Sequence, residues 1–315
     1  MLNRRHLRVK VLQSLYAYFQ SKDGHTAISE KELLTAVERI YDLYLYLLLS
    51  FDELKVQGTR RIEDSKLKIR PTDEELDPNT KFIDNQLISI LGNHPELRAC
   101  SEDRKVNWVG DEHQELFRKM YLNLRESETY FEFMNNDAKG FAEDMVFAIA
   151  VFKSEIANFP LLYDFFEEKS IHWMDDIDLA CTMVIKTLKN FNEDGPNQIL
   201  PLYKDKEDEV DFIRQLLRKT ISMDVENEKL IDELTSNWEL DRIAKMDVIL
   251  MKMAITELQI FNNIPTKVTL NEYIEISKFY STPKSNGFIN GVLDKAIGRL
   301  DKEGLITKVG RGLKE

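Results

Sequence analysis

The sequence has few of the residues that interrupt regular structure, with only 12 glycines and 8 prolines among 315 residues. Proteins built from short strands and tight turns use many more, so this scarcity argues against an all-β fold. Apolar residues recur instead with helical spacing, and the chain is long enough to bury a sizeable core. We therefore predict an all-α protein made of two helical units.

Long apolar runs are also absent. The longest, residues 43–51, is interrupted by tyrosines and falls far short of the roughly 20 residues that a membrane span needs. The amino terminus, Met-Leu-Asn-Arg-Arg-His, lacks the basic, apolar and small-residue succession of a secretion signal. These two features predict a cytoplasmic protein without a membrane partner.

Residues for catalysis or metal binding are scarce. Cys100 and Cys181 have no CxxC partner or neighbouring histidine, so we expect ordinary thiols. The five histidines are dispersed, and the motifs GxxxxGK[ST], GxGxxG, HExxH and GxSxG do not occur. The triplet Asp111-Glu112-His113 could suggest a metal site, but it has no second His or Cys and is interpreted as a helix start. The sequence therefore predicts no enzyme, no metal site and no cofactor.

Positive charge is in short supply, because 43 basic residues face 55 acidic ones and the net charge is −12. Phosphate binding depends on local charge, however, and the first ten residues contain Arg4, Arg5, Arg8 and Lys10 with no acidic residue. On a helix, this spacing gathers three guanidiniums on one side of the first turns, where the helix N-terminus adds partial positive charge. This end is a candidate anion site, although a solvated basic end has the same pattern.

Apolar spacing places the expected helices along the chain. Residues 57–80 contain Gly58, Pro71 and Pro78 and are predicted to be an exposed connection. Asn290-Gly291 would ordinarily suggest a hairpin, but the apolar spacing around it is helical. The expected helices cover residues 4–20, 29–54, 81–91, 111–135, 139–158 and 174–191, then one from about 210, one from 224 or 227, and three over about 240–261, 267–280 and 283–302.

Several ordered blocks of sequence carry a family resemblance. They are Trp238-Glu-Leu-Asp-Arg242, Ile255-Thr-Glu-Leu258, Ile264-Pro-Thr-Lys267, Asn271-Glu-Tyr-Ile-Glu275 and Phe288-Ile-Asn-Gly-Val-Leu-Asp294. Their order and spacing resemble the NusB family, and the arginine-rich start leading into Val11-Leu-Gln-Ser-Leu-Tyr16 is similar to that family's first helix. The resemblance covers roughly residues 1–21 and 205–310, which is less than half of the chain.

The resemblance implies a NusB-like, two-lobed helical bundle interrupted by a long insertion. We expect residues 1–21 to form the first helix of the core, residues 22–204 a helical insertion subdomain, and residues 205–315 the rest of the core with a short tail. The family resemblance further implies a transcription antitermination factor. Such a factor joins the small-subunit ribosomal protein NusE, binds the boxA segment of ribosomal RNA leaders with it, and acts in an RNA polymerase antitermination complex.

The resemblance also assigns roles to individual residues, each with an alternative. Phe288 would offer a ring to an unpaired base or belong to the core, and Asn271 would read a base edge or cap a helix end. Lys284 stands where the family commonly has an acidic residue. Tyr16 and Asp247 would contact NusE. Alternatively, Tyr16 would be a tyrosine at the boundary of the core, and Asp247 would be a surface carboxylate. The implied RNA contacts are Arg4, Arg5, Arg8, Lys10, Lys267, Asn271, Lys284 and Phe288.

Two other functions remain open at this point. One is a NusB-like helical scaffold or regulatory protein that no longer binds RNA. The other is an RNA-modifying enzyme, since certain ribosomal RNA cytosine methyltransferases carry a similar helical domain before a cofactor-binding domain. We expect no such enzyme, because the chain ends at Glu315, directly after the last family-like helix.

Overall fold

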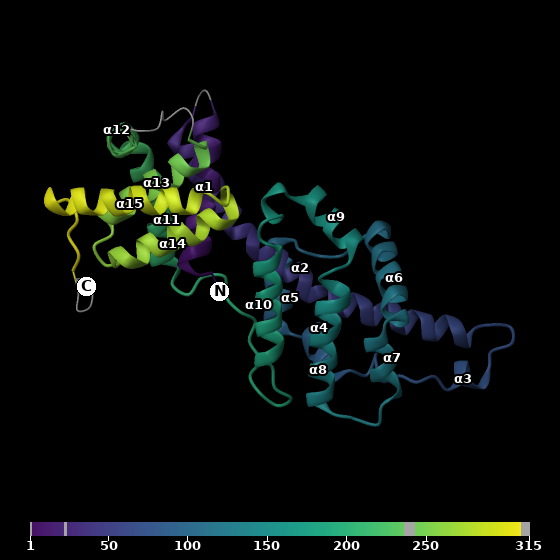
Figure 1. The fold of residues 1–315 in the computed structure, drawn as a ribbon. Coiled ribbons are helices and arrows are strands. Elements are labelled where there is room, and N and C mark those ends of the chain that lie inside the picture. The colour runs from purple at the N-terminus through teal and green to yellow at the C-terminus, as the bar shows by residue number, and fades with distance from the viewer. Residues whose placement is uncertain (1, 22–23, 236–242, 310–315) are drawn as a thin grey trace. The chain divides into compact units, whose positions relative to one another are not determined.

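The computed structural model describes residues 2–21, 24–235 and 243–309. Every regular element within these ranges is helical, which confirms the predicted all-α class (Figure 1). The chain divides into two compact units, which we call the insertion unit, Glu38–Leu202, and the core unit, Leu2–Val37 with Tyr203–Glu315.

The core unit is built around helix α13, which packs against five other helices of the unit. Every residue of α13 from Ile249 to Leu258 is buried, so this helix has no broad solvent face. A helix surrounded in this way must pair each polar side chain internally. The core helices are α1 (Arg4–Gln20), α11 (Lys206–Ser222), α12 (Asp224–Leu234), α13 (Lys245–Ile260), α14 (Thr266–Tyr280) and α15 (Ser285–Lys302).

The insertion unit encloses an aromatic core. The Trp108 ring lies 4.8 Å from that of Tyr46, and its indole N–H donates to the Tyr46 carbonyl over 3.0 Å. Phe166 and Trp173 extend this cluster edge to face. The helices of this unit are most of α2 (Thr26–Lys66), then α3 (Asp73–Leu76), α4 (Gln86–Gly92), α5 (Pro95–Arg104), α6 (Asp111–Glu126), α7 (Glu128–Asn135), α8 (Phe141–Val151), a π-helical turn (Phe152–Ile156), α9 (Pro160–Lys169), a 3₁₀ turn (Ile171–Trp173) and α10 (Ile177–Asn190).

Two prolines that lie between predicted helices are helix starts in the structure. Pro95 begins α5 and Pro160 begins α9, because proline lacks only an N–H that the first helical turn does not use. At the amino terminus, the Asn3 side chain accepts a hydrogen bond from the His6 N–H over 2.9 Å and fixes the start of α1 at Arg4. The predicted range of this first helix is confirmed.

The prediction that residues 57–80 form a connection is wrong for their first part, because α2 continues to Lys66. Gly58, which suggested a break, lies inside the helix and faces the Phe82 ring. A Cβ atom at this position would lie only 3.2 Å from that ring. The glycine therefore permits a close side-chain approach rather than a turn.

The division between the units differs from the expected boundary at residue 22. The segment from Thr26 to Val37, the first part of α2, belongs to the core unit, and the core resumes at Tyr203. Arg218 of α11 holds this segment with two hydrogen bonds to the Glu30 carboxylate, 2.5 and 2.9 Å long. The Trp238–Arg242 block lies outside the described residues.

In the described part of the chain, no single helix is long and apolar enough to cross a membrane. The pair Phe141–Ile156 and Pro160–Lys169 meets the length and composition criterion only jointly, with a bend of 71° between the two segments.

Candidate nucleic-acid interface

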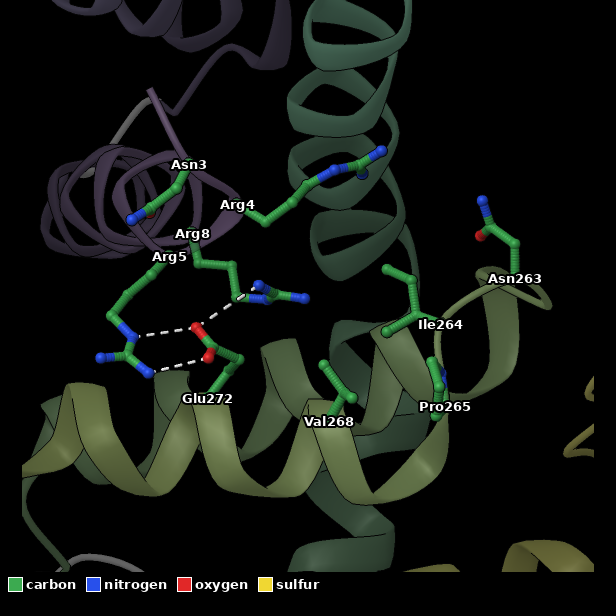
Figure 2. Close-up of a pocket in the computed structure, with 9 residues that line it drawn as sticks. All are labelled: Asn3, Arg4, Arg5, Arg8, Asn263, Ile264, Pro265, Val268 and Glu272. Atoms are coloured by element: carbon green, nitrogen blue, oxygen red, sulfur yellow. Dashed lines mark hydrogen bonds and ion pairs between the residues drawn. The ribbon is translucent and has the colours of Figure 1, made fainter. Parts of the chain in front are cut away.

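A pocket of about 600 Å³ opens in the core unit between the start of α1 and the start of α14 (Figure 2). Three arginines of α1 line it, together with the Ile264–Pro265 turn and Glu272 of α14. Both helices present their N-terminal ends here, where backbone N–H groups lack partners within the helix. Three guanidiniums against one carboxylate, with two helix N-termini, make this pocket a candidate anion site.

Arg5 is the more exposed of the two outer arginines. Its Nε and Nη2 atoms donate to the two oxygens of Glu272 over 2.9 and 2.8 Å, as Figure 2 shows. These hydrogen bonds raise the pKa of Arg5 and hold the pKa of Glu272 below its usual value, even though burial acts in the opposite direction on both. Because the Arg5 side chain is 43% exposed, this pair is open to exchange with another anion.

Arg4 lies on the other side of the pocket, over the flat face of the Phe212 ring. Its guanidinium carbon is 4.2 Å from the ring centroid, and its Nη2 is 2.6 Å from an oxygen of Asp208. The ring holds the planar guanidinium in place, while the exposed carboxylate uses only part of its donors. Arg4 therefore keeps N–H groups for a further acceptor.

Arg8 differs from the expectation that it shares an exposed surface with Arg4 and Arg5. Its side chain is 2% exposed and donates through Nε and Nη2 to Glu257 of α13 over 2.8 and 2.7 Å. Burial alone would lower the pKa of Arg8, but the hydrogen bonds and charge of Glu257 raise it. This guanidinium is committed to a buried ion pair and is not available to an outside ligand in this structure.

Glu257 accepts two further hydrogen bonds, from the Thr269 hydroxyl over 2.9 Å and the Tyr273 hydroxyl over 3.0 Å. Its carboxylate is completely buried, so four donors replace the water that it has lost. Thr269 and Tyr273 both belong to α14. The Glu257 network thus joins α1, α13 and α14 directly beneath the pocket.

The other expected RNA contacts lie along and beyond α14. Lys267 and Asn271 are exposed, with Lys267 in the first turn beside the pocket. Lys284 is exposed and Phe288 is half-buried at the start of α15, past the opposite end of α14. Lys10 is buried, at 3% exposure, which differs from its expected place near the surface arginines.

The two expected protein-contact residues belong to neighbouring helices. Tyr16 is 40% exposed on α1. Asp247 is only 4% exposed, and its carboxylate accepts a hydrogen bond from the Ser281 hydroxyl, so it is neither the expected surface carboxylate nor an open contact. Lys245, two residues earlier, reaches Gln20 at the end of α1 over 3.2 Å. The carboxyl end of α1 and the amino end of α13 therefore meet.

Sequence reasoning assigned no role to Glu257 or Glu272, the two acids that organise the pocket. One signal was present: Arg8 stands three, four and seven residues before Val11, Leu12 and Leu15, and so shares their apolar stripe. An arginine on a buried face needs a buried acidic partner. The described residues contain no group of three or more His, Cys, Asp or Glu side chains that could hold a metal ion.

The fold and this pocket define an all-α protein with a basic site at the start of its first helix. A family model described as NusB family matches residues 178–298. That match begins within α10 of the insertion unit, earlier than the family-like blocks of the sequence. No solved structure matches the chain.

Three curated relatives all carry the name transcription antitermination protein NusB. The protein of Salinibacter ruber is 45% identical over 103 residues, which are 33% of this chain and 64% of that protein. The protein of Chloroherpeton thalassium is 41% identical over 103 residues, or 33% of this chain and 49% of that protein. The matches therefore span less than two thirds of these two relatives.

The protein of Listeria innocua is covered much further. It is 32% identical over 126 residues, which are 40% of this chain and 88% of that protein. Together with the family model, this match shows that the chain belongs to the NusB family.

Proposed function

We propose that this chain is a cytoplasmic, non-enzymatic transcription antitermination factor. It would bind a boxA-type single-stranded segment of ribosomal RNA leaders together with the small-subunit ribosomal protein NusE, within an RNA polymerase antitermination complex. The names of the curated relatives support antitermination. The observation that carries the RNA part is the arginine-lined pocket at the starts of α1 and α14.

The pocket suits a phosphate group for two physical reasons. Guanidiniums grip phosphate oxygens in a fork, and an RNA phosphate brings only acceptors to a site rich in N–H donors. An exposed ion pair such as Arg5–Glu272 contributes only about 0–1 kcal/mol, so exchanging Glu272 for a phosphate costs little. Arg4 and Arg5 are the phosphate contacts that this geometry favours, and Lys267, in the first turn of α14, would add a further contact.

The RNA would continue from the pocket along α14. Lys267, Asn271 and Lys278 are exposed at helical spacing on this helix. With 15 residues at 1.5 Å each, α14 is about 22 Å long and leads to Lys284 and the half-buried Phe288 at the start of α15. Asn271 would read a base edge, and the Phe288 ring would stack on a base.

Arg8 and Lys10 receive a different role in this proposal. Both are buried, so we assign them to positioning rather than to phosphate contact. Arg8 ties α1 to Glu257 and thereby holds Arg4 and Arg5 at the pocket mouth. For the NusE surface, Tyr16 offers an exposed ring, while Asp247 supports the adjoining end of α14 through Ser281.

A second candidate is a NusB-like scaffold or regulatory protein that no longer binds RNA. The observation that favours it is the pairing of all three arginines with carboxylates, Arg4 with Asp208, Arg5 with Glu272 and Arg8 with Glu257. The exposure of the first two pairs favours RNA binding instead, because only the third is protected from exchange.

The double variant Arg4→Glu with Arg5→Glu separates the two candidates. RNA binding predicts a large loss of affinity for a boxA-like RNA. It also predicts a logarithmic salt slope smaller by about 1.4, since each lost phosphate contact to a single strand removes about 0.7. Fluorescence anisotropy over a salt series measures both quantities.

A matched control carries the same charge change elsewhere in the core unit. Lys295→Glu with Lys302→Glu alters two exposed lysines in the later turns of α15, and it should leave the salt slope unchanged. Equal losses in the two double variants would show that net charge alone governs binding. Unchanged binding in the arginine variant would favour the scaffold.

A further inference from the structure

The insertion unit has a basic groove of its own. It measures about 470 Å³ and lies between the last turns of α2 and the middle of α6. Arg60, Arg61 and Lys68 line it from α2 and the residues just after it, and Arg118 lines it from α6. We call this cavity the insertion groove.

Charge in and around the insertion groove is opposite to that of the chain as a whole. Residues 55–70 contain six basic and two acidic residues, whereas the complete chain has a net charge of −12. Of the residues that line the groove, four are cationic and only Asp64 is acidic. Local positive charge of this kind attracts polyanions even on an acidic protein.

Amide groups hold Arg60 in place at the insertion groove. Gln114 of α6 accepts hydrogen bonds from Gln57 over 3.1 Å and from Arg60 over 2.7 Å, and donates to Glu53 over 3.2 Å. Arg60 spends one N–H on this contact and keeps the others. Its guanidinium is therefore oriented before any ligand arrives.

The other three cations are ready to bind an outside anion. Arg61 is exposed and has no ion-pair or hydrogen-bond partner for its side chain among the described residues. Arg118 binds Glu115 through two hydrogen bonds on an exposed surface, and Lys68 pairs with Glu75. Water screens such exposed pairs, so a phosphate can replace either carboxylate.

The hydrogen-bond donors that line the insertion groove suit a phosphate backbone better than a peptide backbone. Arg60, Arg61, Lys68 and Arg118 donate hydrogen bonds and accept none, and Ser65 adds a hydroxyl. A peptide backbone offers as many N–H donors as acceptors, and its donors would find few acceptors here. A phosphate backbone offers acceptors only, so it is the better match.

We propose that the insertion groove binds the phosphate backbone of RNA outside the boxA-type element, without reading its sequence. This inference rests on the proposed RNA-binding function and extends it to a second contact, carried by a part of the chain that the family-like blocks do not cover. The longer RNA is then held at two places. In this proposal the groove contacts the added RNA, and the boxA-type element is left to the core pocket.

The test uses two RNA probes with the full-length protein. One carries only a boxA-like element, and the other carries the same element followed by an unstructured polyuridine tract. Arg61→Glu with Lys68→Glu should weaken binding of the longer probe to the level of the shorter one. It should also lower the logarithmic salt slope for the longer probe by about 1.4.

The control, Lys139→Glu with Lys189→Glu, applies the same charge change to two exposed lysines of the insertion unit outside the groove. If the groove and control variants bind the longer probe equally, the proposal is overturned. The proposal also fails if polyglutamate displaces the polyuridine tract from the groove as well as RNA of equal charge does, because the groove is then a site for acidic protein.

Repeating the titrations in the Arg4→Glu, Arg5→Glu background keeps this inference separate from the proposed function. If the core pocket does not bind RNA, this background change leaves the affinity for both probes unaltered, while the groove variant still weakens the longer one. If the core pocket binds RNA but the insertion groove does not, Arg4→Glu with Arg5→Glu weakens binding of both probes. Arg61→Glu with Lys68→Glu then weakens binding of neither probe.

Discussion

Replacing Arg8 by methionine should destabilise the core unit strongly, although the change removes a residue at the edge of a surface pocket. Methionine fills much of the space of the arginine stem but leaves the Glu257 carboxylate without its two charged donors. Only the hydroxyls of Thr269 and Tyr273 would remain for a carboxylate that is completely buried. A buried charge with that little compensation must bind a proton or draw water into the core.

The expected loss of stability follows from the burial of both partners: the Arg8 side chain is 2% exposed and the Glu257 side chain 0%. Removing one partner of a buried ion pair costs about 3–5 kcal/mol. Since 1.4 kcal/mol is a factor of ten, amide opening should become roughly 100- to 4,000-fold more frequent. The matched variant Arg4→Met breaks a half-exposed pair with Asp208 and should cost no more than about 1 kcal/mol.

Native-state hydrogen exchange measures this effect in the core unit alone, because peptides from α13 and α14 report on it separately from the insertion unit. Adding Glu257→Gln to Arg8→Met removes the stranded charge and should restore part of the loss, with a coupling energy of about 0.5–3 kcal/mol. A loss of stability below about 1 kcal/mol in Arg8→Met would contradict this prediction, because the Arg8–Glu257 pair would then behave like an exposed one.

Two further predictions concern Arg5 and its neighbours. Glu272→Gln removes the anion that competes for Arg5, so it should tighten binding of a boxA-like RNA. The gain should be at most about five-fold, because an exposed ion pair is worth at most about 1 kcal/mol. The control Glu275→Gln removes a carboxylate that binds Lys278 instead, and it should change the affinity less. Burial and the nearby Arg5 charge lower the pKa of His6 in the folded state, so the unfolded state takes up its proton first. The free energy of unfolding should therefore fall as the pH drops below about 6.5. In urea titrations between about pH 7.5 and pH 5, a His6→Gln variant should show a smaller fall than the parent. Weaker RNA binding in Glu272→Gln would contradict the first expectation, and a pH profile in His6→Gln equal to that of the parent would contradict the second.

The fold class and most helix positions could be predicted from local patterns. Apolar spacing gave the exact range Arg4–Gln20 and placed α14 within one residue of its start. The errors arose where one residue has two structural uses. Gly58 falls in a predicted connection and Pro160 in a gap between predicted helices, but Gly58 lies inside a helix against Phe82 and Pro160 begins a helix. Local sequence does not distinguish these uses, because they depend on what packs nearby.

The location of the candidate site could be predicted from the sequence, but the pairing of its side chains could not. The basic residues at the amino terminus indicated an anion site, and the structure places Arg4, Arg5 and Arg8 around one pocket. Their division into two surface contacts and one buried pair depends on Glu257, which is 249 residues away in the sequence. The identity of such a distant partner cannot be read from local sequence, although the position of Arg8 on an apolar stripe is a sign that it needs a buried acidic partner.

The proposed function of this NusB family member depends on its recognition of a boxA-type RNA. The most direct measurement is the affinity of the full-length protein for a boxA-like RNA and for the same RNA with the element scrambled, each with and without NusE, at one fixed salt concentration. We expect tighter binding of the boxA-like RNA and a further gain in affinity when NusE is present. Equal affinity for the two RNAs under both conditions would contradict it, since phosphate contacts alone carry no sequence information.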